Sequence, residues 1–406
     1  MKGDFSRWTF DARNHYTAVL MQEGRVQLDS DWNEQAAMLG HLERTRLEDV
    51  VGSCGVPGGL GFEVYTGADG APMLSAGRIY AGGLACELAA ETPISHVTRT
   101  PLRPEAGRTD LVYLDAWERH VTALDAPDLV EVALGGPDTS TRLQVAWAID
   151  VIEDVGSERC AESSAALPKQ GLGRMTAEAP YGYLGTENQL YRVEIHDGGS
   201  LGEATFKWSR HNGSVLFPVE RFLGPRSAQL GRSLVDPQTI SVGDWFEISG
   251  AEREQLGLPG TFVRVDAWSE NTREGVFDRD VSAQAGATRP RARLWNQTPD
   301  SIVQVESSWI VLEDGIRVRF GGSGFRAGDY WTFPARIASP AVEWPSDAPP
   351  QGVEHRLCPL ALVTWDRSGA GCHDCRRAFV SLTEMYAELL RLRAEVAKLR
   401  GRTETT

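Results

Sequence analysis

The feature that most constrains the fold of this chain is the alternation of short apolar stretches with glycine-containing turns. Asn212–Gly213 and Asp314–Gly315 each separate two stretches rich in β-branched and aromatic residues. Such dipeptides favour two-residue β-hairpin turns, because both turn residues need a positive φ. Two hairpins are therefore predicted in the second half of the chain.

Pairing about each turn predicts a specific register. Around the first turn, Trp208 lies opposite Phe217. Around the second turn, Val311 lies opposite Val318, which leaves Ile310 on the other, partly exposed face. Because side chains alternate between the two faces of a strand, these pairs decide which residues enter the core.

Other stretches extend the β pattern over most of the chain. Residues 76–88 read as a hairpin that turns at Gly82–Gly83, and residues 111–117 and 142–152 read as buried strands. The 42 glycines and 12 tryptophans fit many short, tightly connected strands. The predicted fold is mainly β, an antiparallel, hairpin-rich body of two or more β units, with an N-terminal helix and a short C-terminal coiled-coil helix.

The first fifty residues combine a strand pattern with a helix pattern. Residues 24–29 alternate with a period of two, which predicts a half-buried strand. Asp31 then resembles an N-cap with Glu34 three residues later, and a helix is predicted over residues 32–51. Its apolar positions are Trp32, Ala36, Leu39, Leu47 and Val50. One helix cannot bury all the large apolar residues of this segment, so Trp32 is expected to pack on the β body or on a partner.

The C-terminal residues predict a second helix, over residues 382–400. Its apolar residues follow a heptad seam, Leu382, Met385, Leu389, Leu392, Val396 and Leu399. In a parallel pair of such helices Glu388 faces Arg393 of the neighbour, and Glu395 faces Arg400. The two residues of each pair have opposite charge, which favours a parallel homo-oligomer. The identities of the seam residues do not distinguish a two-stranded from a three-stranded coiled coil.

The predicted boundaries divide the chain into five parts. These are an attachment segment over residues 1–52, a first β unit over 53–154, a linker or insertion over 155–180, a second β-rich unit over 181–380, and the C-terminal helix and tail over 381–406.

Composition excludes several classes of protein. The net charge of −15 argues against a general nucleic-acid binder, because neutralising phosphates requires excess Lys and Arg. The N-terminus lacks a signal-peptide pattern, and no apolar run is long enough to span a bilayer. We therefore expect synthesis and assembly in the cytoplasm, with no membrane insertion.

Six cysteines in a chain of this length do not indicate a disulfide scaffold. Cys54, Cys86 and Cys160 are isolated in the sequence and are interpreted as buried or inert thiols. A candidate zinc site has the ligands His355, Cys358, Cys372 and Cys375. Its alternatives are reduced packing thiols or an oxidisable pair, and no metal or other cofactor is assigned.

No catalytic motif is found. The sequence has no nucleophile elbow, no zinc-protease motif and no phosphate-binding glycine pattern after a strand. His120, His196 and His211 are interpreted as structural histidines. The acidic pair Asp278 and Asp280 could serve a glycosidase, but turn-capping or solvated carboxylates are the more common case.

Two basic islands interrupt the acidic composition. They are the cluster Arg289, Arg291 and Arg293 and the pair Arg376 and Arg377. Each could dock an acidic neighbour in an assembly, and solvated charge beside an edge strand is the alternative interpretation.

Several phrases of the sequence resemble one family. KGDFSRWTF at residues 2–10 and GRVQLDSDWNEQ at residues 24–35 carry the resemblance, and further phrases lie at residues 110–127, 131–142, 204–215 and 327–336. The chain resembles a largely uncharacterised family associated with contractile injection systems, the phage tail-like particles of bacteria. The resemblance implies a structural or fibre-like role near a baseplate, other particle subunits as partners, and a trimer for the C-terminal helix. It supplies no catalytic residues.

Two function classes follow. In the first, the chain is a non-enzymatic adaptor or fibre-like component of such a particle. In the second, the β body binds or cleaves a surface glycan. Only the second predicts a defined small ligand, so a glycan screen with a turnover assay separates them.

Overall fold

The structure is a computed structural model that describes residues 1–68, 70–134, 138–169, 172–233, 239–297, 303–338, 345–366 and 369–403, with the side chains of the C-terminal helix described up to residue 397. It is mainly β, with 38% strand and 18% helix. The sheets are antiparallel apart from one parallel pair, β1 with β24, and helices lie near both termini. The predicted fold class is confirmed.

The chain forms two compact units, each assembled from three separate stretches. The first unit contains residues 1–41, 117–146 and 168–355, and the second contains residues 42–116, 147–167 and 356–406. The sequence-based boundaries at residues 52, 154, 180 and 380 do not coincide with these divisions. Helix α1 (Asp29–Val51) and strands β7 (Thr109–Val121) and β8 (Arg142–Ile152) each run from one unit into the other.

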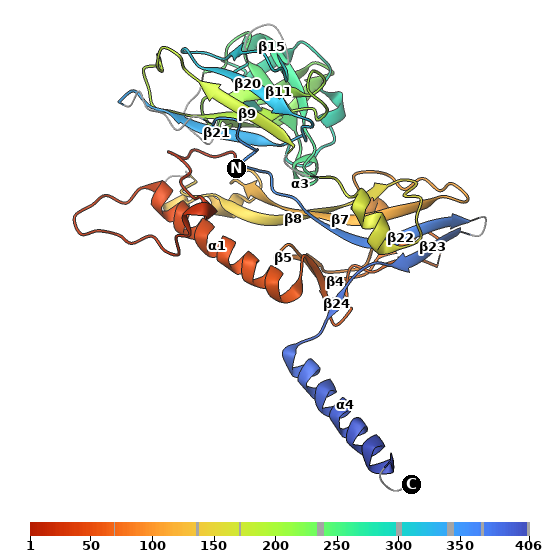
Figure 1. Cartoon of the computed structure of the whole chain (residues 1–406). Coiled ribbons are helices and arrows are strands. Elements are labelled where there is room, and N and C mark those ends of the chain that lie inside the picture. Colours follow the sequence, from red (N-terminus) through yellow and green to blue (C-terminus); the bar gives the residue numbers. More distant parts are fainter. Residues whose placement is uncertain are drawn as a thin grey trace. The chain divides into compact units, whose positions relative to one another are not determined.

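The first unit contains two sheets that share one hydrophobic core (Figure 1). One sheet has the strand order β18-β11-β10-β21 and the other has the order β19-β20-β9. The strands are β9 (Gly173–Glu178), β10 (Gln189–Ile195), β11 (Thr205–Ser209), β18 (Val303–Gln304), β19 (Ile310–Val311), β20 (Arg317–Gly322) and β21 (Tyr330–Ala335). Tyr191 and Phe333 stack between neighbouring strands with their ring centroids 5.6 Å apart, so aromatic packing holds this core.

The first unit also contains a closed six-stranded barrel, in the order β12-β13-β16-β15-β14-β17. The strands are β12 (Leu216–Gly224), β13 (Ser227–Leu230), β14 (Trp245–Ser249), β15 (Thr261–Ser269), β16 (Glu274–Phe277) and β17 (Arg291–Trp295). Phe246 and Ile248 of β14 point into the barrel, where both are fully buried. Trp245 and Glu247 therefore lie on its outer surface, because successive side chains of a strand alternate.

The predicted hairpin about Asn212–Gly213 is wrong in its pairing. Both residues have positive φ, 51° and 64°, as the turn requires. However, β11 pairs with β10 and β18, whereas β12 pairs with β13 and β17, so Trp208 does not face Phe217. The two sheets with the shared core are called here the sandwich, and the turn connects the sheet β18-β11-β10-β21 of this sandwich to the barrel. Local sequence cannot distinguish a turn within a hairpin from a turn between two sheets.

The predicted hairpin about Asp314–Gly315 exists, but its register differs by one residue. Ile310 pairs with Val318, and Val311 pairs with Arg317. The Leu312 N–H donates to the Ile316 carbonyl, so the loop contains three residues rather than two. The shift reverses the faces: Ile310 packs against the core, and Val311 is exposed.

The second unit contains three small sheets, ordered β24-β1-β4-β5, β2-β3-β6 and β23-β22-β7-β8. Besides β7 and β8, the strands are β1 (Cys54–Pro57), β2 (Val64–Thr66), β3 (Pro72–Leu74), β4 (Gly77–Ala81), β5 (Leu84–Leu88), β6 (Thr92–Pro93), β22 (Arg356–Asp366), β23 (Gly369–Asp374) and β24 (Ala378–Phe379). The predicted hairpin at Gly82–Gly83 is confirmed, because Ala81 pairs with Leu84 and both glycines have positive φ.

The helical elements are few and mostly short. The predicted helix over residues 32–51 is α1 (Asp29–Val51), and the predicted C-terminal helix is α4 (Leu382–Thr403). The predicted linker over residues 155–180 contains two helical turns and the whole of β9. The remaining short helices are η1 (Ala12–Asn14), η2 (Ile94–His96), η3 (Pro127–Leu129), η4 (Val132–Leu134), α2 (Cys160–Ser163), η5 (Ser164–Ala166), α3 (Ala251–Gln255) and η6 (Ser282–Gln284).

The start of α1 differs from the prediction. The helix begins at Asp29, and the Asp31 carboxylate accepts a 3.0 Å hydrogen bond from the Leu28 N–H. Asp31 therefore lies in the first turn of the helix and binds the backbone of Leu28, the residue before the helix. The acidic member of a capping box makes this contact, and the N-cap itself does not. Among the described residues, no helix has the length and apolar character that crossing a membrane requires.

Candidate functional site

The N-terminal nine residues, called here the anchor, bind along the first unit. Lys2 Nζ lies 2.8 Å from Glu194 Oε1. Asn212 Nδ2 donates to the Gly3 carbonyl at 2.9 Å and to the Met1 carbonyl at 3.1 Å. The Asn212–Gly213 turn, which was predicted to close a hairpin, therefore holds the anchor. Asn212 has a positive φ, and its side-chain amide faces and binds the anchor backbone.

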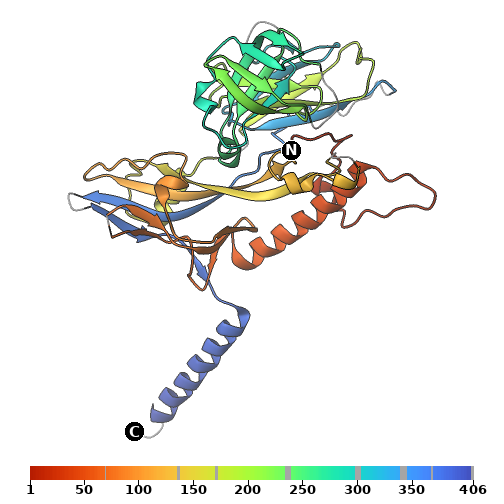
Figure 2. The same cartoon turned by 180° about the vertical axis from the view of Figure 1, so that it is seen from behind.

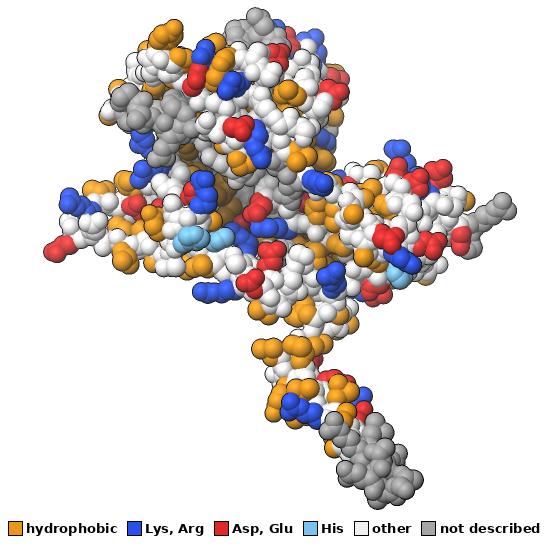
Figure 3. All heavy atoms as spheres, viewed as in Figure 1, with side chains coloured by type: hydrophobic (Ala, Val, Ile, Leu, Met, Phe, Trp, Pro, Cys, Tyr) orange, Lys and Arg blue, Asp and Glu red, His pale blue; other side chains and the backbone are white. Residues whose placement is uncertain are grey.

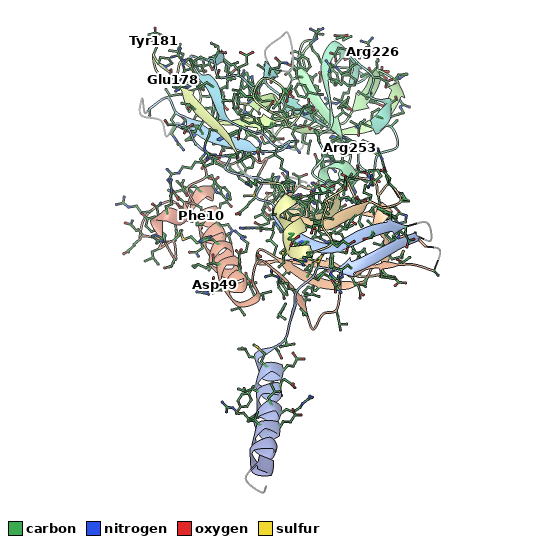
Figure 4. All side chains as sticks on the ribbon, turned by 45° about the vertical axis from the view of Figure 1, so that its right-hand side comes forward. Phe10, Asp49, Glu178, Tyr181, Arg226 and Arg253 are labelled. Atoms are coloured by element: carbon green, nitrogen blue, oxygen red, sulfur yellow. A yellow bond between two sulfur atoms is a disulfide. The ribbon has the colours of Figure 1, made fainter. Side chains whose placement is uncertain are left out.

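The anchor is also joined to the beginning of α1. Both the Ser6 N–H and its hydroxyl donate to the Asp29 carboxylate, at 2.9 and 2.6 Å, and the Thr9 hydroxyl donates to Glu34. Phe10, next in sequence, packs against α1, with its ring centroid 5.7 Å from that of His41 (Figure 4). The two N-terminal motifs are thus contacting parts of one structure, with the anchor donating hydrogen bonds to the first helical turns.

Beneath the anchor lies a layer of charged residues, Arg192, Glu194, His196, Lys207 and Glu247, which we call the charged layer. Arg192, Glu194 and Lys207 occupy the faces of β10 and β11 that point away from the sandwich core, and Glu247 lies on the outer surface of the barrel. All five are buried. Strand alternation therefore places these charges between the sandwich sheet and the barrel.

Ion pairs and hydrogen bonds join the members of the charged layer. Lys207 Nζ lies 2.6 Å from Glu247 and 3.3 Å from Glu194, and it is 4.7 Å from the ring centroid of Trp295. Arg192 Nε lies 2.6 Å from Glu194. Each buried charge has at least one opposite charge in contact, as burial requires.

The environment shifts the pKa values in the directions that these contacts dictate. Burial alone would raise the pKa of Glu194, but Lys2, Arg192 and Lys207 outweigh burial and hold its pKa well below the usual value. Burial, followed by the positive charge of Lys207, lowers the pKa of His196 to about 4. The carboxylate is therefore ionised and the imidazole neutral at pH 7.

The charged layer joins the sheet to the barrel, because Lys207 Nζ lies between Glu194 of β10 and Glu247 of β14. A small pocket lies beside the anchor, whose own residues form part of its wall. It is lined by Met1, Phe5, Trp8, Leu190, Asn212, Tyr330, Thr332 and Gln351, so its walls are aromatic and amide groups.

Residues 15–28, called here the arm, leave the anchor and return to α1 (Figures 1 and 2). The strand predicted over residues 24–29 does not form. Leu20 and Val26 are 84% and 83% exposed, and Tyr16, Met21 and Leu28 are also exposed, whereas Val19 is half-buried. Most of the apolar side chains of the arm are therefore not covered by the part of the chain that the structure describes.

Trp32, the predicted interaction residue of the N-terminal segment, lies at the base of the arm and is 69% exposed. Leu39 and Val50, from the same predicted apolar stripe, are also exposed, and Met38 is the apolar residue of α1 that is buried. The described part of the chain does not cover Trp32, Leu39 or Val50, so of the two expected packing surfaces for Trp32, the β body and a partner, the partner remains.

Helix α4 carries the predicted C-terminal interaction residues. Ser381 caps it by a reciprocal pair of hydrogen bonds with Glu384. The predicted seam residues with described side chains are exposed along it, namely Leu382, Met385, Leu389, Leu392 and Val396 (Figure 3). The side chains of Leu399 and Arg400 lie outside the described residues, so the pair of Glu395 with Arg400 has no structural description.

The charges of α4 also pair within the helix. Arg391 Nε lies 3.7 Å from Glu388 and 3.7 Å from Glu395. These are exposed contacts one turn apart, of the kind that contributes only a few tenths of a kcal/mol. Arg393 is exposed, so it remains available to a second helix.

The zinc candidate is not assembled. Cys358 forms a disulfide with Cys54, and Cys375 forms one with Cys160. His355 instead packs against the ring of Trp117, and Cys372 is a free thiol. The described residues hold no other group of three or more metal-binding side chains. Interpreting Cys54 and Cys160 as inert thiols is also wrong, because both form disulfides. Their partners are 304 and 215 residues away, so local sequence gave no sign of the pairing.

Two of the three arginines in the predicted cluster are buried rather than solvated, whereas Arg289 is exposed and donates to the Asp125 carbonyl. Arg291 is fully buried, with its guanidinium 2.7 Å from Asp125 and 3.1 Å from Glu254. Arg293 is buried beside the same glutamate. Both occupy the outer surface of β17, where partners distant in sequence cover them, and sequence spacing gave no signal of this.

The other candidates have local roles. Asp278 accepts from the Arg264 N–H, and Asp280 accepts from the Ser282 N–H at the start of η6. Asp280 therefore caps a local turn, whereas Asp278 binds the backbone of β15 and the side chain of Arg279. Arg376 lies between Asp374 and Glu63, so it serves an ion pair within the second unit.

A family model described as a family of unknown function, DUF6519, matches residues 1–180, 174–240 and 275–366. These ranges include the anchor, the arm, α1 and most of the charged layer; Glu247 is the member outside them. No curated protein and no solved structure matches the chain.

Proposed function

The chain belongs to the DUF6519 family, and we propose that it is a non-enzymatic structural component, a baseplate-associated adaptor or fibre-like protein, of a bacterial contractile injection system or phage tail-like particle. Other subunits of the particle are its proposed partners. The resemblance of the N-terminal motifs supplies the kind of particle, and the chain's exposed surfaces supply the manner of attachment.

The observation that carries this proposal is the exposure of the arm and of Trp32. The two sheets and the barrel of the first unit each bury a cluster of large apolar side chains, although single strand residues such as Val311 and Val276 are exposed. Against that background, Leu20, Val26 and Trp32 lie within one stretch and are each more than two thirds exposed. Contiguous exposed apolar groups mark surfaces that another protein covers.

The anchor supports the same proposal, because it fixes the base of the arm to a rigid unit. Lys2 contacts the buried Glu194, and Ser6 contacts Asp29 at the start of α1. A docking segment held in this way loses less conformational entropy on binding than a free tail would.

We propose further that α4 joins copies of the chain in a parallel homo-oligomer. Its apolar face is exposed, and Glu388 and Arg393 are placed to pair between parallel neighbours. Leu390 and Tyr386 are also exposed and widen the apolar face beyond the heptad seam, which favours more than two strands. Sedimentation equilibrium of the full chain, beside a chain that ends after Thr383, tests this. A monomeric mass for both would contradict it.

The proposed location is synthesis and assembly in the cytoplasm, followed by release as part of the particle. The two disulfides, Cys54–Cys358 and Cys160–Cys375, support a later stage in an oxidising compartment, because cytoplasmic thiols are generally kept reduced.

The experiment that tests the proposed function is purification of the particles from the source bacterium. Quantitative mass spectrometry should find this chain in a fixed ratio to the other subunits. Trp32→Ala should lower that ratio, whereas Tyr181→Ala should not, because Tyr181 is a 92% exposed aromatic residue of the same unit outside the arm (Figure 4). Particles that contain no copy of the chain would contradict the proposal.

A second candidate is a glycan-binding or glycan-cleaving protein, favoured by the pocket beside the anchor. Phe5, Trp8 and Tyr330 provide aromatic surface, and Asn212 and Gln351 provide amide groups. Such combinations suit sugar rings, which have apolar faces and hydroxyl edges. A glycan screen of the wild-type chain and of Trp8→Ala, with a turnover assay on any ligand found, tests it.

A further inference from the structure

We infer that the arm is a strand donor, which adds to the open edge of a β-sheet in another subunit of the particle. This inference rests on the proposed function and specifies the chemistry of the contact. Three properties of residues 15–28 carry it: their sequence, their unused backbone hydrogen-bonding groups and the way their two ends are held.

The arm has the composition of a strand without being one. Residues 16–22, YTAVLMQ, are uncharged and rich in residues that favour strands, and residues 25–28 alternate polar and apolar side chains. In the structure neither stretch belongs to a sheet. Sequence and local structure therefore disagree for the arm.

The backbone of the arm is available for pairing. Leu20, Val26 and Gln27 have N–H groups that find no acceptor in the part of the chain that the structure describes. Their side chains are exposed as well. An extended segment with free N–H and C=O groups and alternating apolar side chains is what a sheet edge recognises in strand addition.

The two limbs of the arm are held at their bases and joined by a tight turn. The Val19 N–H donates to Gln35 Oε1 at 2.7 Å, and the Leu28 N–H donates to Asp31 at 3.0 Å. Between them the Arg25 N–H donates to the Gln22 carbonyl, with Gly24 at φ 70°. The arm is thus a preformed loop whose sides are open, and this lowers the entropy lost when it pairs.

The arm's chemistry indicates the kind of edge it fits. Because residues 16–22 carry no charge, the receiving edge must offer apolar positions for Leu20 and its neighbours rather than ionic partners. The first unit has open sheet edges of its own, such as β18 and β21, and the arm pairs with neither of them within this chain. The proposed occupant is an open sheet edge on a different subunit.

The test uses amide hydrogen exchange of the full chain, free and within purified particles. In the free chain the amides of Leu20, Val26 and Gln27 should exchange at nearly unprotected rates. In the particle they should slow by about tenfold or more, because strand pairing gives them acceptors. A concentration-dependent slowing in the free protein would assign the arm to a second copy and overturn the inference.

Proline substitutions separate backbone pairing from side-chain contact. Along an added strand only alternate N–H groups face the partner, so one of Val26→Pro and Gln27→Pro should reduce incorporation into particles much more than the other. Val26→Thr is the matched control, since it keeps the N–H and the branched shape. Neither proline removes a hydrogen bond of the free chain, so the melting temperatures should be unchanged.

The outcomes distinguish the inference from the function on which it rests. If the wild-type chain is absent from particles, both are overturned. If the chain is incorporated and its arm amides stay unprotected, or if both prolines reduce incorporation equally, strand addition is overturned and the proposed function stands.

Discussion

Lys2 and Glu194 form an ion pair of 2.8 Å, in which the glutamate side chain is 3% exposed and the lysine 27% exposed. The pair ties the N-terminal anchor to the sheet that also contacts the barrel through Lys207. It is the link between the sequence motif at residues 2–10 and the body of the first unit. The charged layer therefore has a structural function that its burial makes testable.

Replacing Glu194 with Gln should destabilise the first unit by about 3–5 kcal/mol, because Lys2, Arg192 and Lys207 would lose a shared buried counter-charge. Chemical unfolding followed by tryptophan fluorescence measures the change. Glu220→Gln, at an exposed position of the same unit, should change stability by less than about 0.5 kcal/mol. Equal effects of the two substitutions would show that the layer is not a structural link.

Stability should fall as the pH is lowered below about 6.5, where unfolded histidines become protonated. Burial, the largest cause, lowers the pKa of His120 to about 3. A group whose folded pKa is depressed stabilises the protein above its unfolded pKa, and this contribution is lost as the pH falls toward the folded value. Burial raises the pKa of Asp329 to about 6, which opposes the trend.

A comparison with His120→Gln isolates the histidine contribution. Between pH 6.5 and 4 the melting temperature of the wild-type chain should fall more steeply than that of the variant, which has no imidazole at position 120 to protonate. Parallel curves over this range would mean that His120 titrates normally in the folded protein.

Alkylation should find two reactive cysteines after denaturation without a reductant, Cys86 and Cys372, and all six after reduction. In the native protein Cys86 should stay unlabelled, because burial removes access and raises its pKa to about 12. Peptide mass spectrometry identifies the sites. Labelling of Cys54 or Cys160 without a reductant would contradict the two disulfides.

Local sequence predicted those elements whose partners are close in the chain. The hairpin at Gly82–Gly83 was predicted correctly, because a turn and its flanking residues determine it. At Asn212–Gly213 the same reasoning gave the correct φ values and the wrong strand partner, because β11 and β12 join different sheets. The glycine turn specifies a reversal of the chain and does not specify what lies beside each strand.

The candidate site was less predictable for the same reason. Arg291 looked exposed in sequence, since its partners Asp125 and Glu254 are distant, and only the folded barrel brings them together. The disulfide of Cys54 with Cys358 joins residues that are 304 positions apart. Conversely, the apolar residues of the arm were read as burial signals, and they are exposed because nothing within the described chain covers them.

Trp32→Ala should leave the stability of the free chain within about 0.5 kcal/mol of wild type, because Trp32 is 69% exposed. Trp331→Ala, at a fully buried position of the same unit, should cost about 3–5 kcal/mol. Differential scanning calorimetry of both variants compares them. A large loss for Trp32→Ala would show that the tryptophan packs on its own chain and would remove it from the docking surface.

The most direct measurement of the central claim is a cryo-electron microscopy map of the intact particle, resolved well enough to assign side chains. We expect density for the sandwich and the barrel of the first unit at the baseplate, with Trp32 and the arm covered by a different subunit. A map in which every protein density is assigned to other chains, or in which this chain is present with Trp32 and the arm facing solvent, would contradict the account.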